Sequence, residues 1–174
     1  MKRSTTKLVA ILLAFQLPAA ASAISRTASA TLIRGDGTAI GQASLTPKDG
    51  GLWLEVDART LTPGAHGLHL HAVGTCTAPD FVSAGGHWNP REHRHGAEAA
   101  DGAHMGDLPN LVADDAGNAH LAVLVSMAAL DGSEMGVLDA DGTAIVIHAG
   151  PDDYKTDPSG NSGARVACGV VKAN

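Results

Sequence analysis

Hydrophobic positions along this chain recur in short stretches of alternating or β-branched residues, and no long segment shows helical periodicity. Turn-forming residues separate the stretches, as in Asp36-Gly37, Thr62-Pro63-Gly64 and Asp141-Gly142. Short strands at this spacing within one chain predict an antiparallel sandwich or barrel. The expected strands are Ala28–Ile33, Ala39–Leu45, Gly51–Ala58, Gly64–Ala72, Asn118–Val125, Gly142–Ala149 and Ala164–Val171.

Two segments lack this strand pattern. Val73–Gly117 spans about 45 residues and contains three prolines and four histidines, and Pro151–Gly163 is a second, polar loop. Loops longer than about 12–15 residues are uncommon in compact domains and are usually functional or disordered. A bound metal, or a disulfide that ends at Cys76, would order the longer segment.

The N-terminus predicts a signal peptide over Met1–Ala23. Three basic residues precede an apolar run of about ten residues, and Ala21-Ser22-Ala23 is a small-residue cleavage signal. An N-terminal anchor helix is the alternative, although a membrane span requires about 20 apolar residues. No cysteine follows the cleavage signal, so no lipid anchor is indicated. Cleavage after Ala23 leaves one domain, Ile24–Asn174, of 174 less 23, or 151, residues.

Charge narrows the class of partner. The whole chain has a formal net charge of −6 with neutral histidines, and loss of the three basic residues before Ala23 leaves about −9. A protein this acidic is not expected to bind nucleic acid or an anionic membrane surface.

The chain has two cysteines, Cys76 and Cys168. In an exported protein such a pair favours a disulfide, with two free thiols or two metal ligands as the alternatives. Chain-entropy models give a bridge that closes a loop of about 90 residues a stabilisation of roughly 4–5 kcal/mol.

Nine histidines are many for a chain of this length, and their placement is informative. His69 and His71 are two residues apart in an expected strand, so their side chains share one face, while Leu68 and Leu70 face the core. His148 ends another expected strand. Three imidazoles on two strands favour copper or zinc. Two surface histidines and one core histidine are the alternative.

A second group lies in the longer loop, where His87, His95, His104 and Asp107 fall within about 20 residues of glycine-rich chain. Three imidazoles and one carboxylate suit a closed, tetrahedral zinc site. A solvated polar loop is the alternative. Spacing alone does not decide between His95 and its neighbour His93 as the ligand.

Four motifs, in order along Thr27–Val171, resemble those of the copper,zinc superoxide dismutases. They are Gly64–His71 with Gly74-Thr75-Cys76, Gly85–Pro90, His95-Gly96 with His104–Asn110, and Gly163–Gly169. The resemblance implies an all-β fold, an eight-stranded antiparallel Greek-key sandwich or barrel with a long metal-binding loop. It also implies superoxide dismutase activity on the superoxide anion, with one copper and one zinc ion per subunit.

The resemblance implies ligands for both metals. The implied copper ligands are His69, His71, His87 and His148, and the implied zinc ligands are His87, His95, His104 and Asp107. His87 would bridge the two metals and take part in catalysis together with Arg165, which would stand beside the open copper position.

Other roles also follow from the resemblance alone. Asp152 would link His69 to His95 from outside the ligand sets, and Cys76 and Cys168 would form the family disulfide. His66 would support the site without binding a metal. His120 matches no family role, and we interpret it as an exposed histidine on a strand.

Departures from the family pattern bear on location and rate. Pro151–Gly163 is shorter than the charged steering loop of the eukaryotic branch, and Lys155 is its only base. The signal peptide and Gly85-Gly86 before His87 resemble the bacterial exported branch, which implies the periplasm and a homodimer or a monomer. Two other functions stay open: a non-catalytic periplasmic copper-binding protein on the same fold, and a zinc hydrolase.

Overall fold

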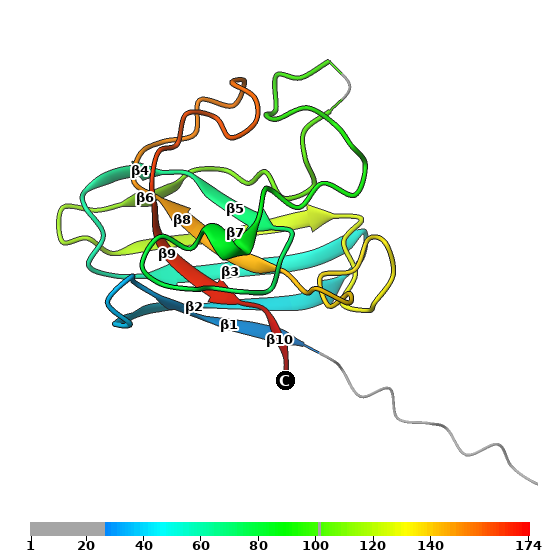
Figure 1. Cartoon of the computed structure of the whole chain (residues 1–174), viewed down its shortest axis with the longest axis horizontal. Coiled ribbons are helices and arrows are strands. Elements are labelled where there is room, and N and C mark those ends of the chain that lie inside the picture. Colours follow the sequence, from blue (N-terminus) through cyan, green and yellow to red (C-terminus); the bar gives the residue numbers. More distant parts are fainter. Residues whose placement is uncertain (1–26, 101) are drawn as a thin grey trace, which may run out of the picture.

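The computed structural model describes residues 27–100 and 102–174 (Figure 1). Within these residues all the regular secondary structure is β-strand, apart from one short 3-10 helix, η1 (Val82–Ala84). The strands are β1 (Ala28–Ile33), β2 (Ala39–Lys48), β3 (Gly51–Ala58), β4 (Gly64–His66), β5 (Leu68–His71), β6 (Leu111–Ala113), β7 (Ala119–Ser126), β8 (Ala144–His148), β9 (Arg165–Val170) and β10 (Lys172–Ala173). The expected signal peptide, Met1–Ala23, lies outside the described residues.

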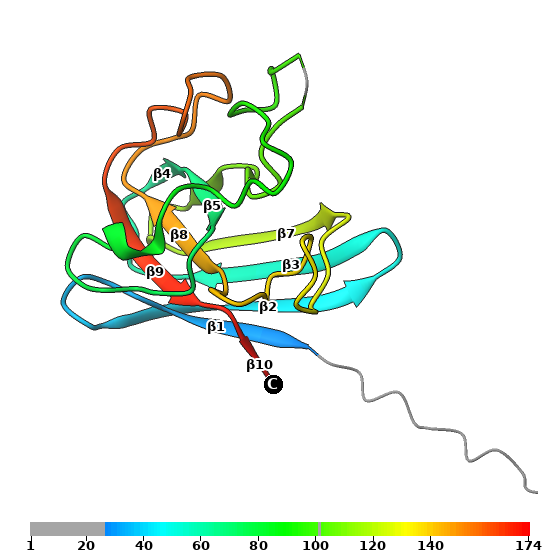
Figure 2. The same cartoon turned by 45° about the vertical axis from the view of Figure 1, so that its right-hand side comes forward.

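All ten strands belong to one sheet, in the order β4-β6-β7-β3-β2-β1-β9-β8-β5, with β10 beside β1. The strands at the two ends of this order, β4 and β5, are separated in the chain by Gly67 alone. The sheet therefore curls until its edges nearly meet, as Figures 1 and 2 show from two sides. Strands such as β1 and β9 pair although they are distant in sequence, so connections cross the barrel ends, as in a Greek key. The expected antiparallel barrel is confirmed.

The strands form because their apolar residues alternate. In β3, Leu52, Leu54, Val56 and Ala58 are buried, whereas Glu55 and Asp57, which alternate with the last three, are exposed. Full burial of one such aliphatic side chain stabilises the fold by about 1.5–3 kcal/mol. The inward residues of all the long strands join into one contiguous core.

The expected strand Gly64–Ala72 is two strands in the structure. At Gly67 the chain leaves its partner β6 and pairs with β8 instead. The Gly67 N–H donates to the carbonyl of Gly150, and the Gly67 carbonyl accepts from His148 N–H, each at 2.8 Å. A Cβ at this position would lie 2.7 Å from that of Ser162, so a larger residue does not fit.

Two short strands lie outside the expected set. β6 lies within Val73–Gly117, the segment for which the sequence predicts no strand. A strand of three residues is too short to show a period in the sequence. Its alternation is visible only in the fold, where Leu111 and Ala113 are buried and Val112 is exposed. β10 has two exposed residues and extends the edge beside β1.

Two loops lie together on one side of the barrel and position the site (Figures 1 and 2). The long loop is residues 72–110, and the short loop is residues 149–164. They are joined where the carboxylate of Asp157 accepts from His95 N–H at 2.8 Å and the Tyr154 carbonyl accepts from Glu98 N–H at 3.2 Å. No helix in the described part of the chain is long and apolar enough to cross a membrane.

Candidate metal centre

Three histidines reach the site from neighbouring strands. β5 places Leu68 and Leu70 in the core and turns His69 and His71 to its other face. β8 pairs with β5 and ends at His148, whose ring centroid lies 4.9 Å from that of His69 and 5.7 Å from that of His71. All three imidazoles are buried.

The long loop brings His87 to the same place by pairing with the free edge of β5. Trp88 N–H donates to the Leu70 carbonyl at 2.8 Å, and Leu70 N–H donates to the Gly106 carbonyl at 2.9 Å. His87 is thereby placed opposite His71, and its ring stacks on His69 with 3.8 Å between centroids.

These four histidines each present one buried ring nitrogen that has no hydrogen-bond partner. The atoms are His69 Nδ1, His71 Nε2, His87 Nε2 and His148 Nε2. One ligand atom from each of the four residues lies within 4.8 Å of the others. A buried polar atom without a partner costs about 1–3 kcal/mol, so four together favour a bound cation that all of them could ligate. Four imidazole nitrogens suit copper.

The second ring nitrogen of these histidines is hydrogen-bonded, which fixes both the tautomer and the ring orientation. Nδ1 of His71 donates to the Gly85 carbonyl at 2.9 Å, and Nδ1 of His148 donates to the Gly163 carbonyl at 3.0 Å. The Nε2 lone pairs are therefore free to bind a metal.

Burial keeps three of these four rings, those of His71, His87 and His148, neutral at neutral pH. It lowers the pKa of His71 to about 2, and it lowers the pKa values of His87 and His148 to about 4. Neighbouring histidines and Arg165 add to the effect on His71 and His148, because each disfavours a further positive charge.

A second cluster adjoins the first and shares the ring of His87. Three Nδ1 atoms surround one carboxylate oxygen, Asp107 Oδ1, with His87 at 2.8 Å and both His95 and His104 at 3.1 Å. Asp107 Oδ2 accepts from the backbone N–H groups of Gly96 and His104. Three imidazoles and one carboxylate match a closed zinc site with no position left for water.

The carboxylate of this cluster is ionised. Burial alone would raise the pKa of Asp107, but hydrogen bonds with His104 and His87 and from the Gly96 N–H hold it well below its ordinary value. Asp107 therefore supplies a negative charge to the cluster down to strongly acidic pH.

Asp152 connects the two clusters from behind. Its carboxylate lies 2.6 Å from His69 Nε2 and 3.0 Å from His95 Nε2, and both histidines use their Nδ1 atoms inside the clusters. Burial would raise the pKa of Asp152, but hydrogen bonds with His69 and His95 lower it below the ordinary value. Bonds of this kind fix ring orientation and ligand basicity.

Two residues that sequence reasoning did not single out hold Asp152 in place. The Asn110 amide bonds the Asp152 backbone at both ends, accepting from its N–H at 2.8 Å and donating to its carbonyl at 3.0 Å. Tyr154 Oη accepts from Asn110 N–H at 2.7 Å, and Tyr154 N–H donates to Asp152 Oδ1 at 2.7 Å. Asn110 lies in a motif quoted above, but no sequence pattern marks Tyr154.

Arg165 stands at the mouth of the first cluster. A cleft there is lined by His71, His87, His148 and Arg165, together with Asn89 and Ser159. The guanidinium donates to the carbonyls of Phe81 and Gly85, each at 2.6 Å. Burial lowers its pKa, but an arginine keeps its charge at neutral pH.

The expected disulfide is confirmed: Cys76 and Cys168 are bonded, with 5.7 Å between their Cα atoms. Cys168 is buried in β9, and Cys76 begins the part of the long loop that contains Phe81 and Gly85. The bridge thus ties the two carbonyl acceptors of Arg165 to the barrel.

The remaining histidines lie outside both clusters. His66 is buried, and its two ring nitrogens face the carbonyls of His148 and Thr62 at 2.7 and 2.8 Å. The Thr62 hydroxyl also lies 3.3 Å from His66 Nε2, so both ring nitrogens have partners within the protein. His93 Nδ1 lies 3.2 Å from the Ala103 carbonyl, and the ring belongs to neither cluster.

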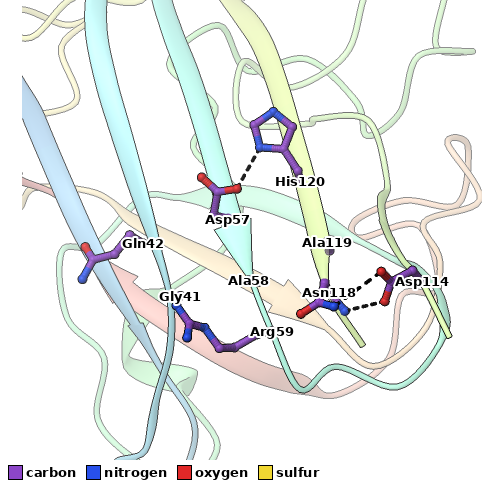
Figure 3. Close-up of a pocket in the computed structure, with 9 residues that line it drawn as sticks. All are labelled: Gly41, Gln42, Asp57, Ala58, Arg59, Asp114, Asn118, Ala119 and His120. Carbon is purple, nitrogen blue, oxygen red and sulfur yellow. Dashed lines mark hydrogen bonds and ion pairs between the residues drawn. The ribbon is translucent and has the colours of Figure 1, made fainter. Parts of the chain in front are cut away.

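His120 lies on the outer face of the barrel, in the cleft of Figure 3. It is exposed and bonds Asp57, its neighbour on β3, at 2.9 Å. Exposed pairs of this kind contribute about 0–1 kcal/mol.

Fold and site together define a β-barrel with two adjoining histidine clusters that could hold metal ions and that share one imidazole. The family model described as copper/zinc superoxide dismutase (SODC) matches residues 39–171. The chain belongs to the copper/zinc superoxide dismutase family, and its function is that of an oxidoreductase acting on superoxide with copper and zinc as cofactors.

Individual relatives agree over most of the chain. A Cu-Zn superoxide dismutase of Aquifex aeolicus is 44% identical over 145 residues, which are 82% of this chain and 86% of that protein. A Cu-Zn superoxide dismutase of Caulobacter vibrioides is 42% identical over 149 residues, 84% of this chain and 86% of that protein. The crystal structure of a SOD-like protein from Bacillus subtilis has a TM-score of 0.78 and 41% identity, covering 82% of this chain and 96% of that one.

Proposed function

We propose that the protein dismutates superoxide in the periplasm through a copper site and a zinc site built from the two clusters. The proposed copper ligands are His69, His71, His87 and His148, and the proposed zinc ligands are His87, His95, His104 and Asp107. One observation carries this proposal: four buried ring nitrogens without partners face one another, and one of them belongs to a ring shared with the second cluster.

Copper, when bound, supplies the one-electron exchange by which two superoxide anions become dioxygen and hydrogen peroxide. The residues of the chain supply charge and protons. Arg165 holds the anion at the cleft mouth, because its guanidinium carries a fixed positive charge there. When it is not bound to the metal, His87 Nε2 would hold one of the two protons that the peroxide requires, and solvent would supply the other.

The second cluster keeps the His87 ring in place while Nε2 gains and loses its proton. Its Nδ1 faces Asp107, whose carboxylate is fixed in turn by two backbone N–H groups. Asp152, held by Asn110, fixes the rings of His69 and His95 on either side. Such support is what a general acid or base needs to transfer a proton repeatedly at one position.

Export and assembly form the second part of the proposal. The predicted signal peptide Met1–Ala23 and the bond between Cys76 and Cys168 both fit an oxidising compartment outside the cytoplasm. The mature domain would be Ile24–Asn174, without a membrane anchor. The proposed assembly is a homodimer or a monomer, and sedimentation of the mature protein distinguishes the two.

The decisive experiment is the decay of a superoxide pulse in the presence of mature, oxidised protein loaded with copper and zinc, compared with protein loaded with zinc alone. We expect fast decay that depends on copper and turns over many times. Absence of acceleration, with both metals confirmed bound, would contradict the proposal.

A non-catalytic copper-binding protein is the second candidate. A protein of Bacillus subtilis that is 42% identical over 146 residues is named superoxide dismutase-like. Sequence identity of this size therefore does not by itself establish the activity. The pulse experiment separates the two candidates. A zinc hydrolase is disfavoured, because no carboxylate among the described residues lines the cleft where it would activate water.

A further inference from the structure

Arg165 belongs to two clefts. One is the cleft of the first histidine cluster, and the other is lined in part by the turn that joins β1 to β2 and by the start of β9. We name the second one the Arg34 cleft, and its walls include Arg34, Asp36, Thr62, His66, Pro79 and Arg165. Arg165 is therefore a wall residue that the Arg34 cleft shares with the cleft of the proposed copper ligands.

Both guanidiniums of the Arg34 cleft are anchored by neutral groups. The Arg34 side chain donates to the Thr60 carbonyl, and its backbone N–H donates to the Thr38 carbonyl at 2.9 Å. Arg165 donates to two carbonyls, as described above. Carbonyl oxygens fix the side chains but do not neutralise them, so the positive charges stay available to an anion.

No carboxylate in residues 27–100 and 102–174 forms an ion pair with either arginine. Two acids act on them from further away: Asp36, which shares the cleft with Arg34, and Asp80, whose charge reaches Arg165. With two arginines and one carboxylate, the cleft walls carry net positive charge in a strongly acidic protein.

The short loop does not supply this charge. Its only base, Lys155, is exposed and does not line the cleft of the first cluster. The cleft of Figure 3 is a useful contrast, because its one arginine, Arg59, is accompanied by Asp57 and Asp114. Two guanidiniums without a paired acid are thus a particular property of the Arg34 cleft among these three.

We propose that the Arg34 cleft is a capture site for small oxyanions, in which Arg34 and Arg165 bind the anion together. Superoxide caught there passes along Arg165 to the copper ligands, and inorganic phosphate competes for the same charges. The role in superoxide capture rests on the proposed function, whereas the binding of an oxyanion does not.

Binding is tested first, without reference to turnover. The holoenzyme is reduced so that Cu(I) and Zn(II) are both diamagnetic, and inorganic phosphate is titrated while the arginine Nε–H resonances are followed by NMR. We expect saturable shifts of Arg34 and Arg165, and affinity lower by roughly fivefold in Arg34→Gln at low ionic strength. Arg34→Lys, which keeps the charge, retains most of the affinity.

Arg59→Gln is the matched control, since it removes the same charge from the cleft of Figure 3. It should leave phosphate affinity at the value of the unmodified protein. Equal affinities in Arg34→Gln and Arg59→Gln would overturn the proposal, and so would shifts confined to Arg165.

Capture of superoxide is tested by kcat/KM as a function of ionic strength. We expect Arg34→Gln to lower kcat/KM by roughly two- to fivefold at low ionic strength. The dependence of kcat/KM on salt should also flatten, because salt screens the attraction between Arg34 and superoxide, and the variant lacks that attraction. The same loss in Arg59→Gln would mean that only net charge matters, which overturns the capture role. If the unmodified protein has no copper-dependent activity, the proposed function fails, and the phosphate titration still decides whether the site exists.

Discussion

At the scale of single residues, the central feature is that the two ring nitrogens of His87 face different clusters. His87 places Nε2 among the proposed copper ligands and Nδ1 beside Asp107, so that one ring serves two clusters. The other histidines of the first cluster use one nitrogen inside it and give the second to a carbonyl or to Asp152. No other side chain has two ring nitrogens that could fill both positions.

Replacement of this ring should therefore disable both sites. We expect His87→Ala to abolish superoxide turnover and to lower zinc content, while the barrel core stays folded because His87 is not part of it. Pulse decay, metal analysis and circular dichroism measure the three effects. His120→Ala, which removes an exposed histidine, is the control. Full activity in His87→Ala would exclude the shared role.

Asn110 acts through Asp152 and touches neither cluster directly. We expect Asn110→Ala to weaken zinc retention by about 10–100-fold, because the carboxylate that orients His69 and His95 loses two hydrogen bonds to its backbone. Competition with a chelator measures the affinity, and a change in the Cu(II) spectrum would report the altered His69 ring. Asn118→Ala, at an exposed asparagine, is the matched control. Equal zinc retention in the two variants would contradict this role.

At the scale of elements, the strands position three histidines, and the loops bring the remaining ligands. The loops have little core of their own, and they are held by pairing with the β5 edge, by contacts with each other and by the disulfide. The disulfide connects residues 92 apart in sequence, and it anchors the part of the loop that holds Arg165.

Removal of the bridge should affect both stability and activity. We expect the double replacement Cys76→Ser and Cys168→Ser to lower the free energy of unfolding by about 2–5 kcal/mol. Activity should also fall, because the Phe81 and Gly85 carbonyls no longer fix Arg165. Urea unfolding and pulse decay measure the two effects in the metal-loaded protein. Unchanged unfolding and unchanged activity would show that the long loop does not depend on the bridge.

Much of this arrangement could be predicted from the sequence, and particular residues show where prediction stops. β1 and β3 were predicted with their observed bounds because their alternation is long enough to recognise. β6 was missed because three residues carry no period, and the break at Gly67 was missed because it depends on pairing with β6 and β8, which lie far along the chain.

The same limit applies to the site. His69 and His71 could be paired from their spacing, whereas the choice of His95 over His93 required the resemblance. The link from Asn110 to Asp152 joins two loops 42 residues apart, and no local pattern encodes it. Long-range contacts of this kind depend on how the loops pack.

At the scale of the whole molecule, the buried histidines make metal-free protein sensitive to acid. An unfolded chain protonates its histidines near pH 6.5, whereas the folded protein keeps His87 and His148 neutral to about pH 4 and His71 to about pH 2. The unfolded state therefore binds more protons in this interval. The free energy of unfolding should fall as pH drops below 6.5, by about 1.4 kcal/mol per pH unit for each such histidine.

Thermal unfolding of chelator-treated protein between pH 7.5 and about 4 would measure this effect. We expect the melting temperature to fall steadily below about pH 6.5. His120→Ala, which removes an exposed histidine outside both clusters, is the control. A melting temperature independent of pH over this interval would show that the rings are not kept neutral.

The pairing of the long loop with β5 has a consequence for self-association. β5 is the last strand of the sheet, and the only cover on its outer edge in the described structure is the pairing with the segments around Trp88 and Gly106. Both segments adjoin proposed metal ligands, His87 and Asp107. If these segments detach when the metals are lost, β5 presents bare N–H and C=O groups to which a strand of another copy can add. Metal loading would then decide whether the barrel keeps its native assembly or aggregates by strand addition at β5.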